Sequence, residues 1–311
     1  MITGGLAWLG RHASVVIAIG VFMGLLAPPL AALLAPLLVP AIIGPFLIAL
    51  LRLDWRRLGA YLRAPGLAAL NVLWLLVALP VLIHGAIAPL ELPPGLHTGM
   101  VLMGAASPLM ASASLALILG LDVALAVVVT VLATALMPLT LPALALVLLG
   151  VELQVAFLEL MGRLALIVAG CFALAWLLRR LLSPAFIARH AEPLDGLAVL
   201  GLLTFAIAIM DGVSALLLAD PAFVLGCALA AYLRNAGLQL LGALAFAWRG
   251  LRPALTMGLC SGNANLGLLL AALADRASLE LVVFVAAAQL PIYTLPLVQR
   301  PLYRQWLAHR P

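Results

Sequence analysis

Two long apolar runs of this chain are interrupted by short polar stretches that read alike: Ser-Ala-Ser-Leu-Ala-Leu at residues 112–117 and Asn-Ala-Asn-Leu-Gly-Leu at residues 263–268. Each stretch is followed about one helix later by a related proline-containing ending, at residues 138–142 and 291–296. Interruptions at corresponding positions of two hydrophobic halves are typical of the midplane site of a secondary transporter. The pattern therefore predicts an internal repeat in which each half contributes one broken helix.

The composition indicates that the solvent of this chain is lipid. Hydrophobic residues make up 67% of the 311 positions and charged residues 9%, and the mean hydropathy is +1.28. The polar residues are too few to cover the surface of a soluble globule of this size. We therefore expect a single integral membrane domain over residues 1–311. Hydropathy predicts ten spans, at residues 13–35, 37–52, 65–88, 97–119, 122–149, 156–178, 194–218, 221–247, 253–274 and 279–299.

The distribution of charge predicts the orientation of these spans. All sixteen basic residues are arginines. In a ten-span arrangement the loops on one side carry most of them, namely Arg11, Arg52, Arg56, Arg57, Arg63, Arg179, Arg180, Arg189, Arg249, Arg252, Arg300, Arg304 and Arg310. The positive-inside rule therefore places both termini in the cytoplasm, with the first span retained as a membrane helix. The lysine-free, Ala- and Leu-rich composition favours a bacterial inner membrane.

Enzyme and nucleic-acid-binding functions find no support in the residues. The predicted spans contain one acid at mid-depth, Asp211, and His84 and His97 lie near a span boundary. No HExxH or CxxC motif is present, and the serines of the first polar stretch have no basic partner at helical spacing. The arginines are spread over short loops without a basic face. We therefore expect neither catalysis nor an organic cofactor.

The two interruptions contain the residue types that break helices and bind solutes. Pro108 precedes the first polar stretch, and Gly258 and Gly262 precede Asn263 and Asn265 in the second. A broken membrane helix frees backbone groups that must line a cavity or bind a solute; half-helix N-termini suit anions and free carbonyls suit cations. The alternative is that these small residues serve only close helix packing.

A buried charge is predicted in the second half. Arg234 and Asn235 lie within the span 221–247, with Gln239 one turn later, and Asp211 lies in the preceding span. An intramembrane charge is a functional candidate by default. Arg234 is therefore a candidate for binding an anionic substrate or for supplying the charge of a missing ion. The alternative is a buried pair of Arg234 with Asp211 that fixes the hairpin between the two spans.

The order of these elements resembles the bile acid:sodium symporter family. The resemblance rests on Leu-Arg-Leu-Asp at residues 51–54, the broken segment 104–114, the segment 121–130 and the second break at 258–268, and it covers nearly the whole chain. It implies an all-α fold of ten helices in two inverted five-helix repeats, about residues 13–149 and 156–299. It also implies a core of helices 3, 4, 5, 8, 9 and 10, a panel of helices 1, 2, 6 and 7, and a midplane crossing of helices 4 and 9.

The resemblance also implies where sodium ions bind, and this chain departs from those positions. The first sodium site corresponds to Ser112, Ala113, Ala126 and Thr130, which retain half of the side-chain oxygens. The second corresponds to Leu75, Gly258 and Gly262, and the asparagine that follows is kept as Asn263. Since sodium needs several oxygens, two bound sodium ions are not expected. Ser114 and Asn265 are candidates for rebuilding a single site; a proton, or no ion, is the alternative.

The sequence thus predicts a secondary transporter of a small organic anion that works by alternating access in the lipid bilayer. The ion-binding candidates are Ser112, Ser114, Thr130, Asn263 and Asn265, and the substrate-binding candidates are Arg234, Asn235, Asp211, Gln239 and Asn263. The alternatives are a proton-coupled or uncoupled carrier of the same fold, and a non-transporting membrane sensor or assembly subunit.

Overall fold

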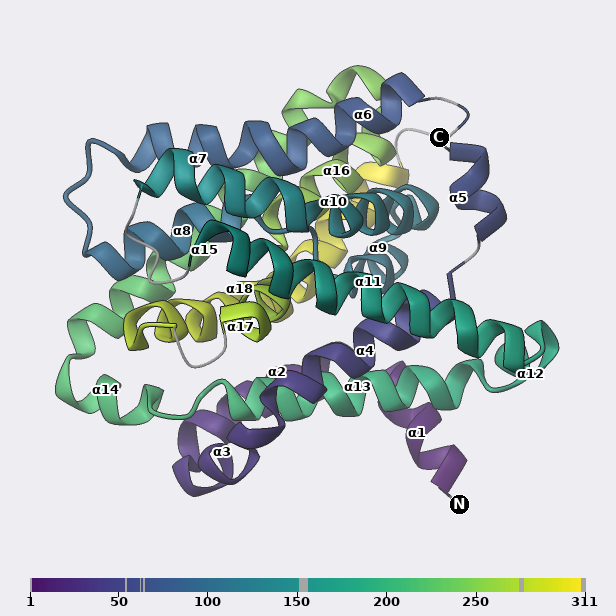
Figure 1. The fold of residues 1–311 in the computed structure, drawn as a ribbon, viewed down its shortest axis with the longest axis horizontal. Helices are drawn as coiled ribbons and strands as arrows, with labels where there is room; N and C mark the ends of the chain where they lie inside the picture. Colours follow the sequence, from purple (N-terminus) through teal and green to yellow (C-terminus); the bar gives the residue numbers. More distant parts are fainter. Residues whose placement is uncertain are drawn as a thin grey trace.

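The computed structural model describes residues 2–53, 55–61, 63, 65–150, 156–273 and 277–308. These residues are almost entirely helical (Figure 1). The first half contains α1 (Ile2–Arg11), α2 (Ala13–Leu26), α3 (Pro28–Leu34), α4 (Leu38–Leu51), α5 (Trp55–Tyr61), α6 (Pro65–Leu73), α7 (Leu79–Ile87), α8 (Pro94–Ala105), α9 (Ser112–Leu119) and α10 (Val123–Leu149). The second half contains α11 (Phe157–Leu181), α12 (Pro184–Arg189), α13 (Ala191–Ala208), α14 (Val213–Ala219), α15 (Pro221–Ala245), α16 (Leu251–Gly262), α17 (Leu266–Leu273) and α18 (Leu279–Ala308).

Seven helical segments of the described chain are long and apolar enough to cross a membrane, and an eighth is added if α1 and α2, which meet at an angle of 88°, count as one span. The seven are Pro28–Leu51, Pro65–Ile87, Val123–Leu149, Phe157–Leu181, Ala191–Ala219, Pro221–Ala245 and Leu279–Ala308. Helices satisfy their own backbone groups, which lipid cannot do. The chain is therefore a multi-pass membrane protein, as its composition predicts.

Two further predicted spans, 97–119 and 253–274, are each built from two half-helices. The first consists of α8 and α9, with 12 and 8 residues, and the second of α16 and α17, also with 12 and 8 residues. At about 1.5 Å per residue no half reaches across a hydrocarbon core of about 30 Å. Each crossing therefore requires both halves, as expected for helices broken within the membrane.

The predicted boundary between the first two spans, at residues 35–37, is wrong. The chain turns at Ala27 instead, where α2 ends and α3 begins with Pro28 and Pro29. A proline lacks the backbone N–H that a helix interior needs but is well suited to a first helical turn. From Pro28 the chain continues to Leu51 through a 3-10 turn at Ala35–Leu37, which accommodates Pro36 without ending the span.

The predicted span 194–218 is confirmed as the candidate span Ala191–Ala219, but it contains an internal turn. Helix α13 ends at Ala208, and α14 begins at Val213 after a turn in which Gly212 has the left-handed φ of 77°. Asp211 lies in this turn and is exposed. The sequence pattern hides the break because every neighbouring residue except Asp211 is apolar or small.

The arginines gather at one end of the molecule. Helices α1, α5 and α12 lie at one end of the long axis, whereas α3 and α14 lie at the opposite end (Figure 1). We call the first the arginine-rich end, because the elements that meet there carry Arg11, Arg52, Arg179, Arg180 and Arg189. These five are among the arginines that the sequence assigns to one side of the membrane.

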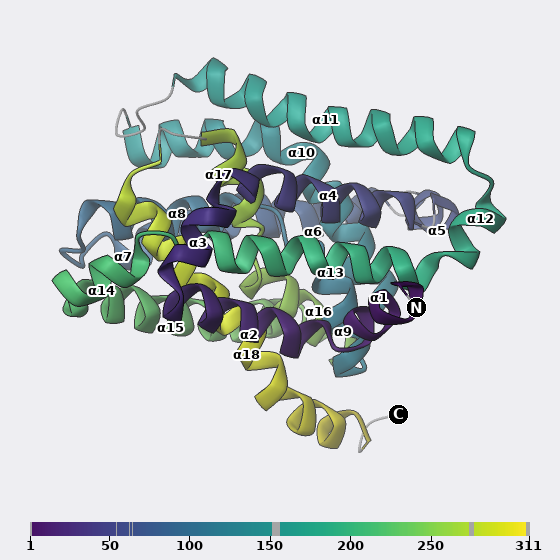
Figure 2. The same ribbon diagram turned by 90° about the horizontal axis from the view of Figure 1, so that it is seen from below.

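The helices pack in two groups. In the first group, α13 packs against α1, α2 and α4. In the second, α15 packs against α16 and α18, while α10 contacts α8, α9 and α16. Helix α11 lies along one side of the molecule and contacts both α4 and α10 (Figure 2). The cavity described below lies where the two groups face each other.

Candidate functional site

The two broken segments cross and hydrogen-bond to each other. The Leu109 amide donates to the Asn263 carbonyl oxygen at 2.8 Å, and the Asn265 amide donates to the Ser107 carbonyl oxygen at 2.7 Å. These bonds flank an antiparallel bridge between Pro108 and Ala264. Backbone groups freed by a helix break are costly in lipid unless they find partners. At this crossing, backbone groups freed by each break therefore find hydrogen-bond partners in the other break.

The local sequence explains why the helices break here. Pro108 has no amide hydrogen, and it disfavours helical geometry at the residue before it. Helix α8 accordingly ends at Ala105, and Ala106 is already extended, with φ −77° and ψ 147°. In the second segment α16 ends at Gly262, and the side-chain oxygen of Asn265 accepts a 3.4 Å hydrogen bond from the Leu268 amide in the first turn of α17.

The break in the first segment is displaced from the polar stretch that predicts it. Ser112 and Ser114 belong to the first turn of α9, and the non-helical residues are 106–111. The bridge places Ala264 opposite Pro108, whereas the two similar stretches align Ala264 with Ala113. Pro108 lies among these non-helical residues.

The two glycines predicted as helix-breaking residues lie where α16 packs against α15. Gly258 is inside α16, and a side chain there would meet the carbonyl oxygen of Gln239 in α15. Gly262 is the last residue of α16, and a Cβ atom would lie 2.7 Å from the Asn235 carbonyl oxygen. Helices α15 and α16 can therefore approach closely only because both positions lack a side chain.

A cavity of about 630 Å³ lies next to the crossing. Residues of α1, α2, α4 and α13 form one wall, and residues of α9, α10, α17 and α18 form the other. Near the crossing the cavity has few polar lining residues: Ser114, Thr130, Asn265, Gln289 and Tyr293. The rest of the inner lining is apolar, which is the usual character of a small-molecule pocket.

The cavity extends toward the arginine-rich end. Its charged lining residues are Arg11, Arg52, Glu192 and Asp195, and Arg52 forms an ion pair with Asp195 across α4 and α13. Partial burial lowers the pKa of Arg52. The segments that line the cavity are the end of α4 with the two residues after it (42–53), 123–131 of α10 and 192–205 of α13. They are the parts of these elements nearest that end.

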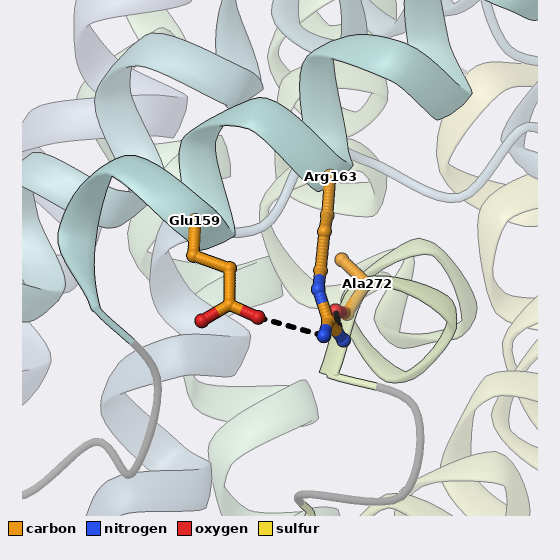
Figure 3. A network of polar contacts seen from close by, with 3 residues as sticks. All are labelled: Glu159, Arg163 and Ala272. Atoms are coloured by element: carbon orange, nitrogen blue, oxygen red, sulfur yellow. Dashed lines mark hydrogen bonds and ion pairs between the residues drawn. The ribbon is translucent and has the colours of Figure 1, made fainter.

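At the opposite end, α11 and α17 are joined by a guanidinium group. Arg163 of α11 donates to the Ala272 carbonyl oxygen in the last turn of α17 at 3.3 Å and to Glu159 Oε1 at 2.7 Å. Figure 3 shows the Arg163 side chain extending from α11 to the carbonyl end of α17. A cation is favourable at this position because helix carbonyls carry partial negative charge.

The predicted ion-binding residues lie in two different environments. Ser112 Oγ and Thr130 Oγ1 are buried and have no hydrogen-bond partner among the described residues, whereas Ser114 is exposed in the cavity wall. Asn265 also lines the cavity. Asn263 is fully buried, and its side-chain oxygen accepts from Asn235 Nδ2 at 2.9 Å.

The predicted substrate-binding residues of α15 lie behind the crossing and do not line the cavity. Asn235 Nδ2 donates to the Gly262 carbonyl oxygen at 3.0 Å, and Gln239 Nε2 donates to Asn235 Oδ1 at 2.7 Å. Arg234 Nη1 lies 3.5 Å from the same Gly262 oxygen. Asp211 is exposed, and no ion pair joins it to Arg234, so the predicted alternative of an Arg234–Asp211 pair is wrong.

Several polar residues of the site escape prediction from sequence. Thr134 Oγ1 donates to Ser107 Oγ at 2.9 Å, which joins α10 to the first break. Gln289 and Tyr293 of α18 line the cavity, and the Tyr293 hydroxyl is buried without a partner among the described residues. The sequence does contain a pattern that could have predicted them. Thr134 follows Thr130, and Tyr293 follows Gln289, at the four-residue spacing that places two residues on one helix face.

Comparison with protein families identifies the family. A family model described as the sodium bile acid symporter family matches residues 39–220, more than half of the chain. The chain belongs to the sodium bile acid symporter family. Membership of this family implies a symporter-type transporter and confirms the resemblance seen in the sequence. A search of curated proteins finds no match to this chain.

The match to the sodium bile acid symporter family includes the first broken segment and ends at Asp220, before α15. The second broken segment, with Asn263 and Asn265, therefore lies outside the matched residues. Its relation to the first segment rests on the geometry of the crossing.

Proposed function

We propose that this family member is a secondary carrier of a small organic anion. The observation that supports the proposal most strongly is that half-helices α9 and α17 both begin at the crossing, and that their first turns line the cavity through Ala113, Ser114, Leu266 and Gly267. The N-terminal end of a helix carries partial positive charge and free amides, which attract anions. Two such ends at one cavity favour a carboxylate or a similar anion.

The rest of the cavity indicates the shape of the ligand. Near the crossing the described lining has no charged side chain, and its polar groups are the hydroxyls of Ser114, Thr130 and Tyr293 and the amides of Asn265 and Gln289. Such a lining suits a small molecule with one anionic end, an apolar body and one or two hydroxyl or carbonyl groups.

The architecture that we propose for transport is two inverted repeats of five spans each. The core consists of α6–α7, α8–α9, α10, α15, α16–α17 and α18, and the panel consists of α2, α3–α4, α11 and α13–α14. The cavity walls support this division, because the α2, α4 and α13 residues belong to the panel and the α9, α10, α17 and α18 residues belong to the core. Movement of the panel against the core would open and close the site by alternating access.

The position of the cavity supports an inward-facing state. It extends to the arginine-rich end, while Arg163 joins α11 to α17 at the other end. By the positive-inside rule we propose that the arginine-rich end faces the cytoplasm, with both termini, in a bacterial inner membrane. The Arg163 contact would then be the closed outer side of the carrier.

The experiment that tests this function starts from ligand binding. Purified protein is screened by thermal unfolding against small mono- and dicarboxylates, since a ligand that binds only the folded state raises the melting temperature. A compound that does so is then tested as a labelled substrate in proteoliposomes. Thr130→Val should weaken its binding and uptake, because the variant keeps the side-chain volume and removes a buried hydroxyl of a lining residue that has no partner among the described residues.

A matched control is available on the same helix. Thr140 lies further along α10, outside the cavity lining, and its hydroxyl bonds to the Leu136 carbonyl. Thr140→Val should leave binding and uptake unchanged. A second variant carries both Asn263→Leu and Asn265→Leu. If cells that carry it show no phenotype, the carrier function is contradicted and a membrane sensor or assembly subunit is favoured.

A further inference from the structure

Arg234 is a buried cation that the cavity does not use. Its side chain is 6% exposed, its Nε atom is buried without a partner among the described residues, and it forms no ion pair with a described carboxylate. A charge at such depth is expensive unless its surroundings compensate it. The group that compensates the charge of Arg234 should therefore indicate the role of this arginine.

The hydrogen-bond partner of Arg234 in another element is the carbonyl end of α16. Arg234 Nη1 lies 3.5 Å from the carbonyl oxygen of Gly262, the last residue of this half-helix. The final carbonyls of a helix have no partner within the helix and carry its partial negative charge. Asn235 Nδ2 donates to the same oxygen at 3.0 Å. Adjacent residues of α15 thus present a full charge and a neutral donor to one carbonyl.

Asn235, the residue next to Arg234, is held by a network of amides. Gln239 Nε2 holds the Asn235 side-chain oxygen at 2.7 Å, and Gln299 Nε2 of α18 donates to Gln239 Oε1 at 2.9 Å. This network joins α15, α16 and α18 on the side of the crossing that does not line the cavity. Because the cavity lining contains residues 264–267 and no residue of α15, Arg234 is placed away from a bound substrate.

In transporters built from broken helices, the unwound carbonyls and the C-terminal ends of half-helices bind the coupling cation. We propose that the Arg234 guanidinium is a tethered cation that occupies this role at the end of α16, so that the carrier works without sodium. The inference rests on the proposed carrier function and specifies its ion requirement. A cation attached to α15 neutralises the Gly262 carbonyl in every step of a transport cycle and cannot dissociate with the substrate.

The first test uses the unmodified protein. Its melting temperature is measured in sodium, potassium and choline chloride at one ionic strength. A bound ion stabilises the folded state by mass action, so a sodium site would give a saturable rise in sodium alone. We expect the same melting temperature in all three salts. A saturable rise specific to sodium would overturn the proposal.

The second test removes the tethered cation and supplies a free one. Arg234→Ala leaves a space beside the Gly262 carbonyl that methylguanidinium can enter, so low concentrations of this cation should raise the melting temperature of the variant. Arg304→Ala is the control, because Arg304 is an exposed arginine on α18. Methylguanidinium should not stabilise Arg304→Ala or the unmodified protein. Absence of a specific effect on a folded Arg234→Ala would contradict the proposal.

A pair of variants covers the case in which Arg234→Ala does not fold. Arg234→Lys keeps the charge, and Arg234→Met keeps an unbranched side chain without charge. We expect the lysine variant to melt closer to the unmodified protein than the methionine variant does. A methionine variant at least as stable as the unmodified protein would show that the charge has no role.

These readouts remain informative if the carrier proposal fails. They measure cation binding to the purified protein and need no substrate. Where a substrate has been identified, its uptake should change by less than twofold when choline replaces sodium. Absence of uptake for every anion tested would count against the carrier function and leave the melting-temperature results to decide the role of Arg234.

Discussion

Replacing Gly262 by alanine tests how closely α15 and α16 must approach behind the crossing. A Cβ atom at this position would lie 2.5 Å from Gln239 Cγ and 2.7 Å from the Asn235 carbonyl oxygen, well inside the ordinary contact range of 3.4–4 Å. The Gln239 side chain can move, but the Asn235 oxygen belongs to the backbone of α15. The two helices must therefore separate by several tenths of an ångström, which overpacking data place at about 1–3 kcal/mol.

Gly237→Ala is the matched control. Gly237 lies on α15 one turn before Leu241, is exposed, and has no atom within 4 Å of the position that a Cβ would take. Alanine in the middle of a helix is favoured over glycine by about 0.5–1 kcal/mol. The two variants should consequently change stability in opposite directions.

Thermal unfolding of the purified variants measures the difference. With about 2 °C for each kcal/mol in a chain of this size, Gly262→Ala should melt roughly 3–8 °C below Gly237→Ala. The separation of the helices should also break the 3.0 Å hydrogen bond from Asn235 Nδ2 to the Gly262 carbonyl. Equal melting temperatures for the two variants would refute the close approach of α15 and α16.

Three further predictions follow from single contacts. Thr130→Val should weaken binding of an identified anion by about threefold to tenfold, as the loss of one hydrogen bond of about 1 kcal/mol requires, while Thr140→Val leaves the dissociation constant unchanged. Arg163→Gln removes the charge beside the Ala272 carbonyl and should raise labelling of an engineered cavity cysteine from the side opposite the arginine-rich end; equal labelling would rule out Arg163 as an outer closure. Asn235→Leu leaves the buried Asn263 Oδ1 without its donor and Gln239 Nε2 without its acceptor, and should lower the melting temperature more than the exposed substitution Leu233→Ala does.

The sequence predicts the features of this fold that depend on local chemistry. Apolar runs between arginine-bearing loops identify the long spans, because lipid imposes both the length and the hydrophobicity of a helix. Pro108 and the polar residues near it identify a broken segment for the same reason. The prediction fails where several local signals compete: Pro28 and Pro29 end the first span, whereas Pro36 does not interrupt the second.

The site depends on contacts that no local pattern contains. Leu109 and Asn263 are 154 positions apart, and their hydrogen bond exists because two half-helices cross. The same crossing decides that Asn265 faces the cavity while Asn263 faces Asn235, although the two asparagines are separated by one residue. The exposure of Asp211 likewise follows from a left-handed turn at Gly212 that hydropathy does not reveal.

The most direct test of the carrier is the accessibility of Ser114, which lines the cavity at the crossing. The three native cysteines are buried, so Ser114→Cys can be labelled with a membrane-impermeant thiol reagent in sealed vesicles of either orientation. Ser183→Cys, exposed between α11 and α12, is the control and should react only from the arginine-rich end. We predict that Ser114→Cys reacts from that end, that Arg163→Gln makes it reactive from the other end as well, and that an anion which stabilises the protein slows both reactions. Reaction of Ser114→Cys from one side only, in both backgrounds and without protection by any such anion, would contradict alternating access.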